Sequence, residues 1–221
     1  MCDKMVTNVQ LGGCAMRLYC AKIPSPADIP HLMEFVPPAR KACFPRFEGA
    51  AARTAVGWAL LSYGLAKDFD IFPVPEIVLA PGGKPLFKRC DLYFSISHGK
   101  TYALCAISRY PVGVDVETRR RINPRIRERV LAPGEKDEDF FDMWVLKESY
   151  IKLRGEKDVP FNKINFARSA NTPVFEGNGV FGVLYDEIPG CSAAVCAYNK
   201  PETAGIEFVP RENLCCAENS S

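Results

Sequence analysis

The sequence has no long apolar run, almost no net charge and very little histidine. Its 221 residues hold 28 Lys and Arg against 26 Asp and Glu, which gives a formal net charge of +2. Because the charges nearly balance, nothing indicates a nucleic-acid partner, and any basic site must be local. No segment approaches the roughly 18 consecutive apolar residues of a transmembrane helix, and polar residues interrupt positions 1–10, where a signal peptide would need its apolar run. We therefore expect a cytoplasmic protein that does not associate with a membrane.

Zinc-binding motifs are also missing, although cysteine is plentiful. The ten cysteines include no Cys-x-x-Cys pair, and His31 and His98 are the only histidines, so a zinc framework is poorly supported. Several cysteines, such as Cys105 and Cys196, lie inside apolar segments, where a thiol packs as a small hydrophobic group. We interpret the cysteines as reduced and structural, because a cytoplasmic location disfavours disulfides. A cysteine-rich metal or redox protein is a competing interpretation, which zinc analysis and a free-thiol count would test.

Two long helices and several short strands are predicted, in two halves of similar order. Residues 49–67 and 139–155 have apolar positions at helical spacing and few helix breakers. The predicted strands, rich in apolar and β-branched residues, are 15–22, 76–80, 92–97, 102–108, 112–117, 180–186, 192–198 and 205–209. Strands grouped with one long helix in each half indicate an α+β fold rather than alternating βαβ units. We expect an N-terminal lobe at 1–109, a C-terminal lobe at 110–210 and a polar tail at 211–221.

The connections between these elements carry further predictions. The short polar segment 98–100 between two strands predicts a β-hairpin. Segment 108–113, which contains a proline and a glycine, is the expected inter-lobe linker. A short helix is expected to follow the basic stretch 119–129.

Two carboxylates, Asp115 and Glu117, alternate with valines in the strand predicted at 112–117. Side chains at positions i and i+2 of a strand share a face, so the two carboxylates project together. Adjacent carboxylates repel each other unless a cation or a proton lies between them. An all-oxygen ligand set suits Mg²⁺. The alternative is the solvated face of an edge strand.

A third carboxylate, Glu148, lies on the second long helix among apolar neighbours. A helical projection places Trp144, Val145 and Ile151 around it. A carboxylate on an apolar flank is costly to desolvate unless it is paired or coordinates a metal. Lys152 stands at the i+4 position, where an ion pair forms readily. The alternative is a surface pair of Glu148 with Lys152, worth about 0.3–0.5 kcal/mol.

His98 follows Ser97 at a predicted strand end, beside a glycine where backbone N–H groups can approach an anion closely. With Lys100 and the Gly-Gly-Lys-Pro turn at 82–85, these residues predict a phosphate pocket. Arg53, inside the first long helix, is a further candidate anion contact. The alternatives are a structural histidine and an arginine that extends to solvent along an apolar surface.

Four motifs, taken in order, resemble the 4′-phosphopantetheinyl transferase superfamily in its surfactin-synthetase-activating branch. They are GGKPLF (82–87), FSISHG (94–99), GVDVE (113–117) and WVLKESYIK (144–152). The well-matched part spans about residues 40–155. The resemblance implies a pseudo-dimeric α+β fold, in which two similar lobes, each a long helix on a small antiparallel sheet, enclose one site at their interface.

The activity implied by this resemblance is transfer of 4′-phosphopantetheine from coenzyme A to a serine of an apo acyl or peptidyl carrier protein. Adenosine 3′,5′-bisphosphate would be released, with Mg²⁺ (Mn²⁺ as the alternative) as cofactor and with a monomeric enzyme. A competing interpretation is a non-catalytic coenzyme A-binding module of the same fold. Coenzyme A binding without Mg²⁺-dependent turnover would favour that module.

The resemblance also assigns the site residues. The metal ligands would be Asp115, Glu117 and Glu148, and the catalytic residues Glu148, which would activate the serine, and Lys152. The coenzyme A contacts would be Arg40, Arg53 and His98 at the 3′-phosphate, and Lys84, Pro85, Ser97 and Lys152 at the nucleotide and pyrophosphate. Glu135 matches a second acidic position of the family.

Overall fold

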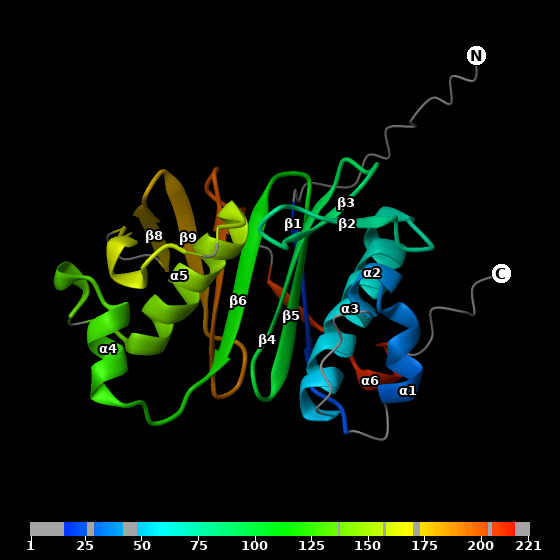
Figure 1. The fold of residues 1–221 in the computed structure, drawn as a ribbon, viewed down its shortest axis with the longest axis horizontal. Coiled ribbons are helices and arrows are strands. Elements are labelled where there is room, and N and C mark those ends of the chain that lie inside the picture. The colour runs from blue at the N-terminus through cyan, green and yellow to red at the C-terminus, as the bar shows by residue number, and fades with distance from the viewer. Residues whose placement is uncertain are drawn as a thin grey trace, which may run out of the picture.

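Two β-sheets packed back to back, each covered by one long helix on its outer face, form the body of the protein (Figure 1). The computed structural model describes residues 16–25, 29–41, 48–136, 138–156, 158–169, 173–202 and 205–214. Within this part, the cysteines at 20, 90, 105, 191 and 196 are free thiols, as predicted, and the other five lie outside it. No helix in the described ranges is both long and apolar enough to cross a membrane.

The first sheet has the strand order β11-β1-β5-β4 and is covered by helix α3 (Glu48–Phe69). Its strands are β1 (Met16–Lys22), β4 (Tyr93–His98), β5 (Tyr102–Ser108) and β11 (Ile206–Phe208). β4 and β5 pair in antiparallel register, which confirms the hairpin predicted at 98–100. β11 lies parallel to the other edge of β1. The sequence analysis places this strand in the C-terminal lobe, whereas the structure adds it to the first sheet. A periodic pattern predicts a strand but does not indicate which sheet edge it joins.

The second sheet has the order β6-β10-β9-β8-β7 and packs against helix α5 (Phe140–Arg154). Its strands are β6 (Val112–Thr118), β7 (Ala167–Arg168), β8 (Val174–Gly177), β9 (Val180–Tyr185) and β10 (Cys191–Ala197). Three of them were predicted to within about one residue. The two short outer strands, β7 and β8, were missed because their sequences carry no sustained alternation.

Short elements complete the fold. They are α1 (Ile29–Leu32), η2 (Met33–Phe35), α2 (Pro38–Lys41), β2 (Ile77–Leu79), β3 (Pro85–Phe87), α4 (Pro124–Val130), η3 (Pro133–Glu135), η4 (Phe161–Lys163) and α6 (Arg211–Leu214). Helix α4 lies inside the basic stretch that we expected to precede a helix, because the Asn123 side chain caps its first turn and Pro124 is its first residue. The expected polar tail begins with α6, whose Leu214 is buried in the first core, and residues 215–221 lie outside the described part.

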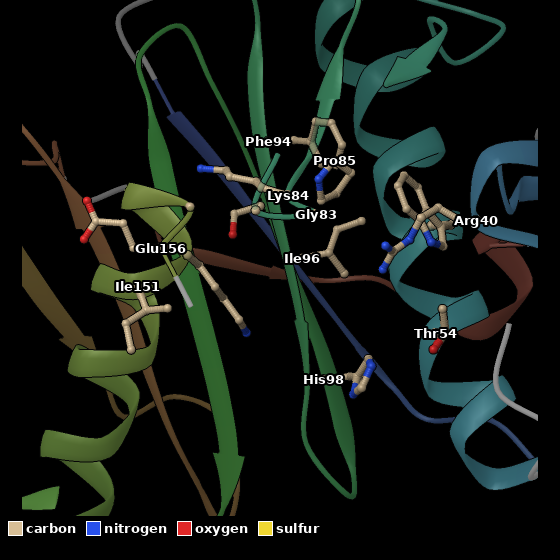
Figure 2. A pocket seen from close by; sticks show the side chains of 15 residues that line it. Arg40, Thr54, Gly83, Lys84, Pro85, Phe94, Ile96, His98, Ile151 and Glu156 are labelled. Atoms are coloured by element: carbon tan, nitrogen blue, oxygen red, sulfur yellow. The ribbon is translucent and has the colours of Figure 1, made fainter. Parts of the chain in front are cut away.

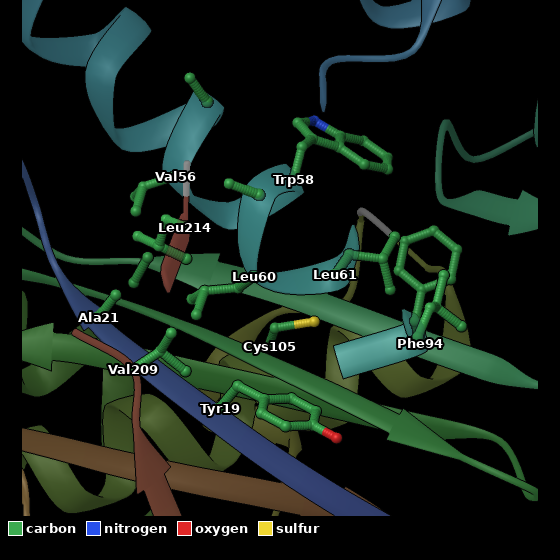
Figure 3. Close-up of a cluster of buried hydrophobic side chains, with 14 of the residues drawn as sticks. Tyr19, Ala21, Val56, Trp58, Leu60, Leu61, Phe94, Cys105, Val209 and Leu214 are labelled. Carbon is green, nitrogen blue, oxygen red and sulfur yellow. The ribbon is translucent and has the colours of Figure 1, made fainter. Parts of the chain in front are cut away.

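Side chains alternate along the central strands between two different cores. In β1, Tyr19 packs toward α3 in the first core (Figure 3), whereas Leu18 and Cys20 pack toward the second sheet. In β5, Cys105 packs toward α3 and Leu104 packs toward the second sheet. Strands with both faces buried have continuous apolar sequences. This arrangement accounts for the unbroken apolar run in β5.

The sheets also meet along their edges, where two serines of β4 face β6. The backbone N–H of Val114 donates to Ser95 Oγ at 3.1 Å, and that of Val116 donates to Ser97 Oγ at 3.4 Å. An unpaired buried N–H is costly. The serine hydroxyls therefore satisfy the edge of β6 without merging the two sheets.

Gly113 allows α5 to lie directly on β6. A Cβ at this position would stand 2.0 Å from Ser149 O and 2.4 Å from Leu153 N, both in the backbone of α5. The glycine therefore fixes how closely the helix approaches the strand, and with it the relative positions of the side chains that the two elements carry.

Replacement of Gly113 by alanine should destabilise the protein, because helix and strand would have to separate. Overpacking of this kind costs about 1–3 kcal/mol in the free energy of unfolding. Urea titration measures this loss. The matched control is Gly134→Ala, where an added Cβ meets nothing within 4 Å. Equal midpoints for the two variants would contradict the close-approach interpretation.

Candidate functional site

A cavity of about 260 Å³ opens between the two halves of the molecule. Its walls come from α2, α3, β4, the turn before β3, and the last turn of α5 with the two residues that follow it. Figure 2 shows His98 and Arg40 on one side of this space, and Ile151 and Glu156 on the other. Residues of the GGKPLF, FSISHG and WVLKESYIK motifs therefore share this lining, whereas Asp115, Glu117 and Glu148 do not belong to it.

Ser97, Asp115 and Lys152 form a hydrogen-bonded group at the seam between the sheets. Ser97 Oγ donates to Asp115 Oδ1 at 2.6 Å. Lys152 Nζ donates to Ser97 Oγ and to Asp115 Oδ1, both at 2.7 Å. The contact from the Val116 N–H completes the partners of this serine. The hydroxyl group of Ser97 thus links three elements, β4, β6 and α5.

The other oxygen of Asp115 has no such support. Asp115 Oδ2 is buried, and no hydrogen-bond partner for it exists among the described residues. A buried carboxylate oxygen is costly unless a hydrogen bond or a cation compensates it. Its orphaned state marks the place where a cation would fit.

Glu148 lies one turn before Lys152 on α5 and is half-buried. Burial raises the pKa of its carboxyl group, and the charges of Asp115 and Glu117 raise it further, against the opposing effect of Lys152. Three carboxylates act on one another electrostatically at this point, which favours a cation or a proton among them.

The predicted metal ligands are not gathered into a finished cage. Glu117 Oε2 accepts a hydrogen bond from Arg120 at 2.8 Å. Within the described ranges, no group of three His, Cys, Asp or Glu side chains stands ready to hold a metal ion. Asp115 supplies an orphaned oxygen and Glu148 a carboxyl group of raised pKa, so the donors suit a hard divalent cation. Glu117 would have to exchange Arg120 for that cation.

The predicted anion contacts lie on the α3 side of the site. Partial burial lowers the pKa of His98, and the positive charges of Lys152 and Arg53 lower it further. Arg40 lines the same cavity, whereas Arg53 is not among its lining residues. Cations that disfavour each other's charge are suited to receive an anion between them. The geometry thus fits a phosphate near His98.

Lys84 and Pro85 also line the cavity, at the turn that precedes β3. Lys84 Nζ donates to Leu153 O at 3.1 Å and to Val112 O at 3.4 Å. Burial lowers the pKa of this amine to about 8. In this arrangement Lys84 joins the turn to a carbonyl in the last turn of α5 and to the first carbonyl of β6.

The sequence analysis gave no role to Lys147, which is completely buried. Its amine forms an ion pair with Glu135 and donates to Val130 O at 2.7 Å. Glu135 accepts further bonds from the backbone N–H groups of Ala132, at 2.9 Å, and Phe166, at 3.0 Å. The pair therefore ties α5, one residue before Glu148, to three other segments. The available signal was a lysine inside the apolar stripe of a helix.

Comparison with known proteins gives matches to one family. The model of the 4′-phosphopantetheinyl transferase superfamily matches residues 111–182. The chain is 26% identical to the 4′-phosphopantetheinyl transferase Sfp of Bacillus subtilis (strain 168) over 208 residues, which cover 82% of this chain and 91% of that protein. It is 38% identical to the gsp protein of Aneurinibacillus migulanus over 85 residues, 34% of this chain and 35% of that protein. It is 34% identical to AcpT of Escherichia coli (strain K12) over 121 residues, 47% and 57% respectively.

Replacement of Lys147 by methionine should strongly destabilise the protein, because Glu135 would remain buried without its counter-charge. Loss of one partner of a buried pair costs about 3–5 kcal/mol in the free energy of unfolding. The double variant Glu135→Gln/Lys147→Met removes both charges and should recover part of that loss, as measured by chemical denaturation at neutral pH. Equal stabilities for the single and double variants would show that the two charges are not coupled.

Proposed function

The chain belongs to the 4′-phosphopantetheinyl transferase superfamily, and on that premise we propose that it transfers 4′-phosphopantetheine from coenzyme A to a serine of an apo carrier protein. Adenosine 3′,5′-bisphosphate is the other product. The observation that carries the proposal is the orphaned oxygen of Asp115, which lies beside Lys152 and Ser97 at the seam. The same point receives a second carboxyl group, that of Glu148.

A divalent cation fits the oxygens at this seam. Asp115, Glu117 and Glu148 would hold Mg²⁺, with Mn²⁺ as the alternative, and the ion would neutralise charge on the pyrophosphate of coenzyme A. A protein side chain would also stabilise the negative charge of the pyrophosphate. Lys152 Nζ, which donates to Ser97 and Asp115, would bind a pyrophosphate oxygen.

The rest of coenzyme A would lie along the cavity. His98 and Arg53, with Arg40, would bind the 3′-phosphate, because these cations gather at one side of the site. Lys84 and Pro85 would border the nucleoside, since their turn forms another part of the wall. Positioning by fixed charges of this kind supplies most of the catalysis in phosphoryl-type transfer.

Glu148 is the proposed general base. The serine oxygen of the carrier protein forms a bond to the phosphorus next to pantetheine, and the bond from that phosphorus to the leaving adenosine bisphosphate breaks. The serine proton passes to the Glu148 carboxylate. Its raised pKa strengthens this carboxylate as a base.

A monomer is sufficient for this reaction, because one chain supplies both sides of the cavity. The competing function is a coenzyme A-binding module without turnover. Such a module would not need Glu148, which has no anion-binding role in the proposed site. A measurement of turnover therefore distinguishes the transferase from the binding module.

Intact-mass analysis of a purified apo acyl carrier protein tests the proposal. After incubation with the enzyme, coenzyme A and Mg²⁺, the carrier should gain the mass of one phosphopantetheine, and removal of the metal with EDTA should prevent the gain. The matched variant is Glu148→Gln, which keeps the shape but cannot accept the serine proton. Its turnover should fall about 10²–10⁴-fold, the usual contribution of general-base assistance, while coenzyme A affinity changes little. No mass gain across acyl and peptidyl carriers would refute the transferase, and full activity of Glu148→Gln would refute the base.

His98→Ala should weaken coenzyme A far more than 3′-dephospho-coenzyme A, because only the former carries the extra phosphate. A charge-assisted hydrogen bond is worth about 1.5–3 kcal/mol, or roughly 10- to 150-fold in affinity. The pKa of His98 is lowered in the free protein. A histidine binds an anion best when protonated, so the preference of the wild type should grow as the pH falls through that lowered pKa. It should shrink as the pH rises above it.

Calorimetry with both ligands at several pH values measures this effect. The variant supplies the control, because it retains the ionisation of the ligand phosphate but lacks the imidazole. Parallel pH profiles for wild type and variant would remove His98 from the 3′-phosphate site.

A further inference from the structure

A second cavity, of about 740 Å³, lies beside helix α2. Its lining shares no residue with that of the first cavity, and α2 contributes to both. Arg40 lines the first cavity, whereas Ala39 and Lys41 line the second. The other walls of the second cavity include η2, the chain at 72–77 and Ser62 of α3. A volume of about 300–1,000 Å³ is typical of ligand sites, and the proposed function gives this cavity no role.

The walls of the second cavity are mainly apolar and present flat side chains. The residues with rings among them are Phe35, Phe72, Pro37, Pro38, Pro73 and Pro75. At 60%, Phe72 is the most exposed large hydrophobic residue in the described part of the chain. Exposed apolar surface beside a cavity is typical of a binding site. These flat faces favour an aromatic ligand, because ring packing adds to the gain from burial.

Ser62 gives this apolar cavity a single buried polar side chain. Among the described residues of the lining, no other side chain is both polar and buried, and Ser62 is only 1% exposed. Its hydroxyl oxygen has no hydrogen-bond partner within the described ranges. By contrast, the hydroxyl group of Thr54, on the same helix, donates to Ala50 O at 3.0 Å. A buried hydroxyl without a partner costs free energy, which a hydrogen bond to a ligand would recover.

The charges of the lining lie at its solvent side. Its titratable side chains are all exposed, and they are His31, Glu34, Lys41 and Glu76. A charged ligand group would lose its hydration inside the cavity without a buried counter-charge to compensate it. The lining therefore matches a neutral molecule that has an aromatic body and one hydroxyl group.

We propose that the second cavity binds a neutral aromatic alcohol, with its rings among the phenylalanine and proline side chains and its hydroxyl group on Ser62. A hydroxyl group both donates and accepts, so either direction of this hydrogen bond satisfies Ser62 Oγ. The inference goes beyond the proposed function, because this ligand takes no part in the transfer. Since α2 belongs to both linings, the ligand would contact the helix that carries Arg40.

The test compares 2-naphthol with naphthalene, which has the same ring system but no hydroxyl group. Equilibrium dialysis measures the affinity of both compounds for the wild type and for Ser62→Ala. One neutral hydrogen bond changes an affinity by roughly 2- to 12-fold, so the preference for 2-naphthol should fall by that factor in the variant. Ser62→Ala should fold normally, because it removes a hydroxyl group that has no partner among the described residues.

A blocking variant locates the site independently of Ser62. Ala39→Trp fills space at the wall that α2 contributes and should abolish the binding of both compounds. Its matched control is Ala167→Trp, which adds the same side chain at an exposed position of β7 and should retain wild-type affinity. Coenzyme A at saturation should not displace 2-naphthol, because the two cavities share no lining residue.

Any of four results would overturn the inference. They are no binding of 2-naphthol to the wild type, an equal preference in the wild type and Ser62→Ala, equal affinities in Ala39→Trp and Ala167→Trp, and displacement by coenzyme A. None of these results bears on the transferase, which the mass of the carrier protein tests separately.

Discussion

The contact between the serines of β4 and the edge of β6 is the constraint on which the site depends. Two sheet edges that met through backbone ladders would merge and leave no space between them. Here hydroxyl groups take the place of the ladder at Val114 and Val116. The same register turns Asp115 toward α5, since its neighbours face the core between the sheets. Serine at positions 95 and 97 thus keeps the sheets separate and provides hydrogen-bond partners for the N–H groups at the edge of β6. The same register leaves the Asp115 carboxylate facing α5.

Two buried carboxylates in this protein show the difference between a structural charge and a site. Glu135 has every oxygen occupied, by Lys147 and by two backbone N–H groups, and it stabilises an arrangement that needs no ligand. Asp115 is equally buried, but only one of its oxygens has a partner among the residues that the structure describes. The cost of desolvation is compensated fully at Glu135 and only partly at Asp115. The incomplete compensation is what makes a cation favourable at Asp115.

Periodicity predicted how the carboxylates are spaced, whereas the roles of Arg40, Lys84 and Pro85 rested on the family resemblance alone. The two-residue repeat of a strand placed Asp115 beside Glu117, and the helical repeat placed Lys152 one turn beyond Glu148. The hydrogen-bond and ion-pair partners of these side chains could not be predicted from periodicity. The contact of Glu117 with Arg120 and the turn of Lys84 toward backbone carbonyls depend on how separate segments meet. The edge that β11 joins depends on the same tertiary geometry, and the back-to-back sheets gave no signal beyond continuous apolar strands.

The pairing of β11 with β1 means that the described amino-terminal half is not a separable module. The strand supplies an outer neighbour to β1, and Val209 and Leu214, which follow it, fill space under α3 (Figure 3). During synthesis, the first sheet therefore lacks an edge and part of its core until residues near 214 have left the ribosome. A fragment that ended after β5 would expose the bare edge of β1, which can pair with another chain. The first sheet and its core are thus completed only by residues that follow the whole second sheet in the sequence.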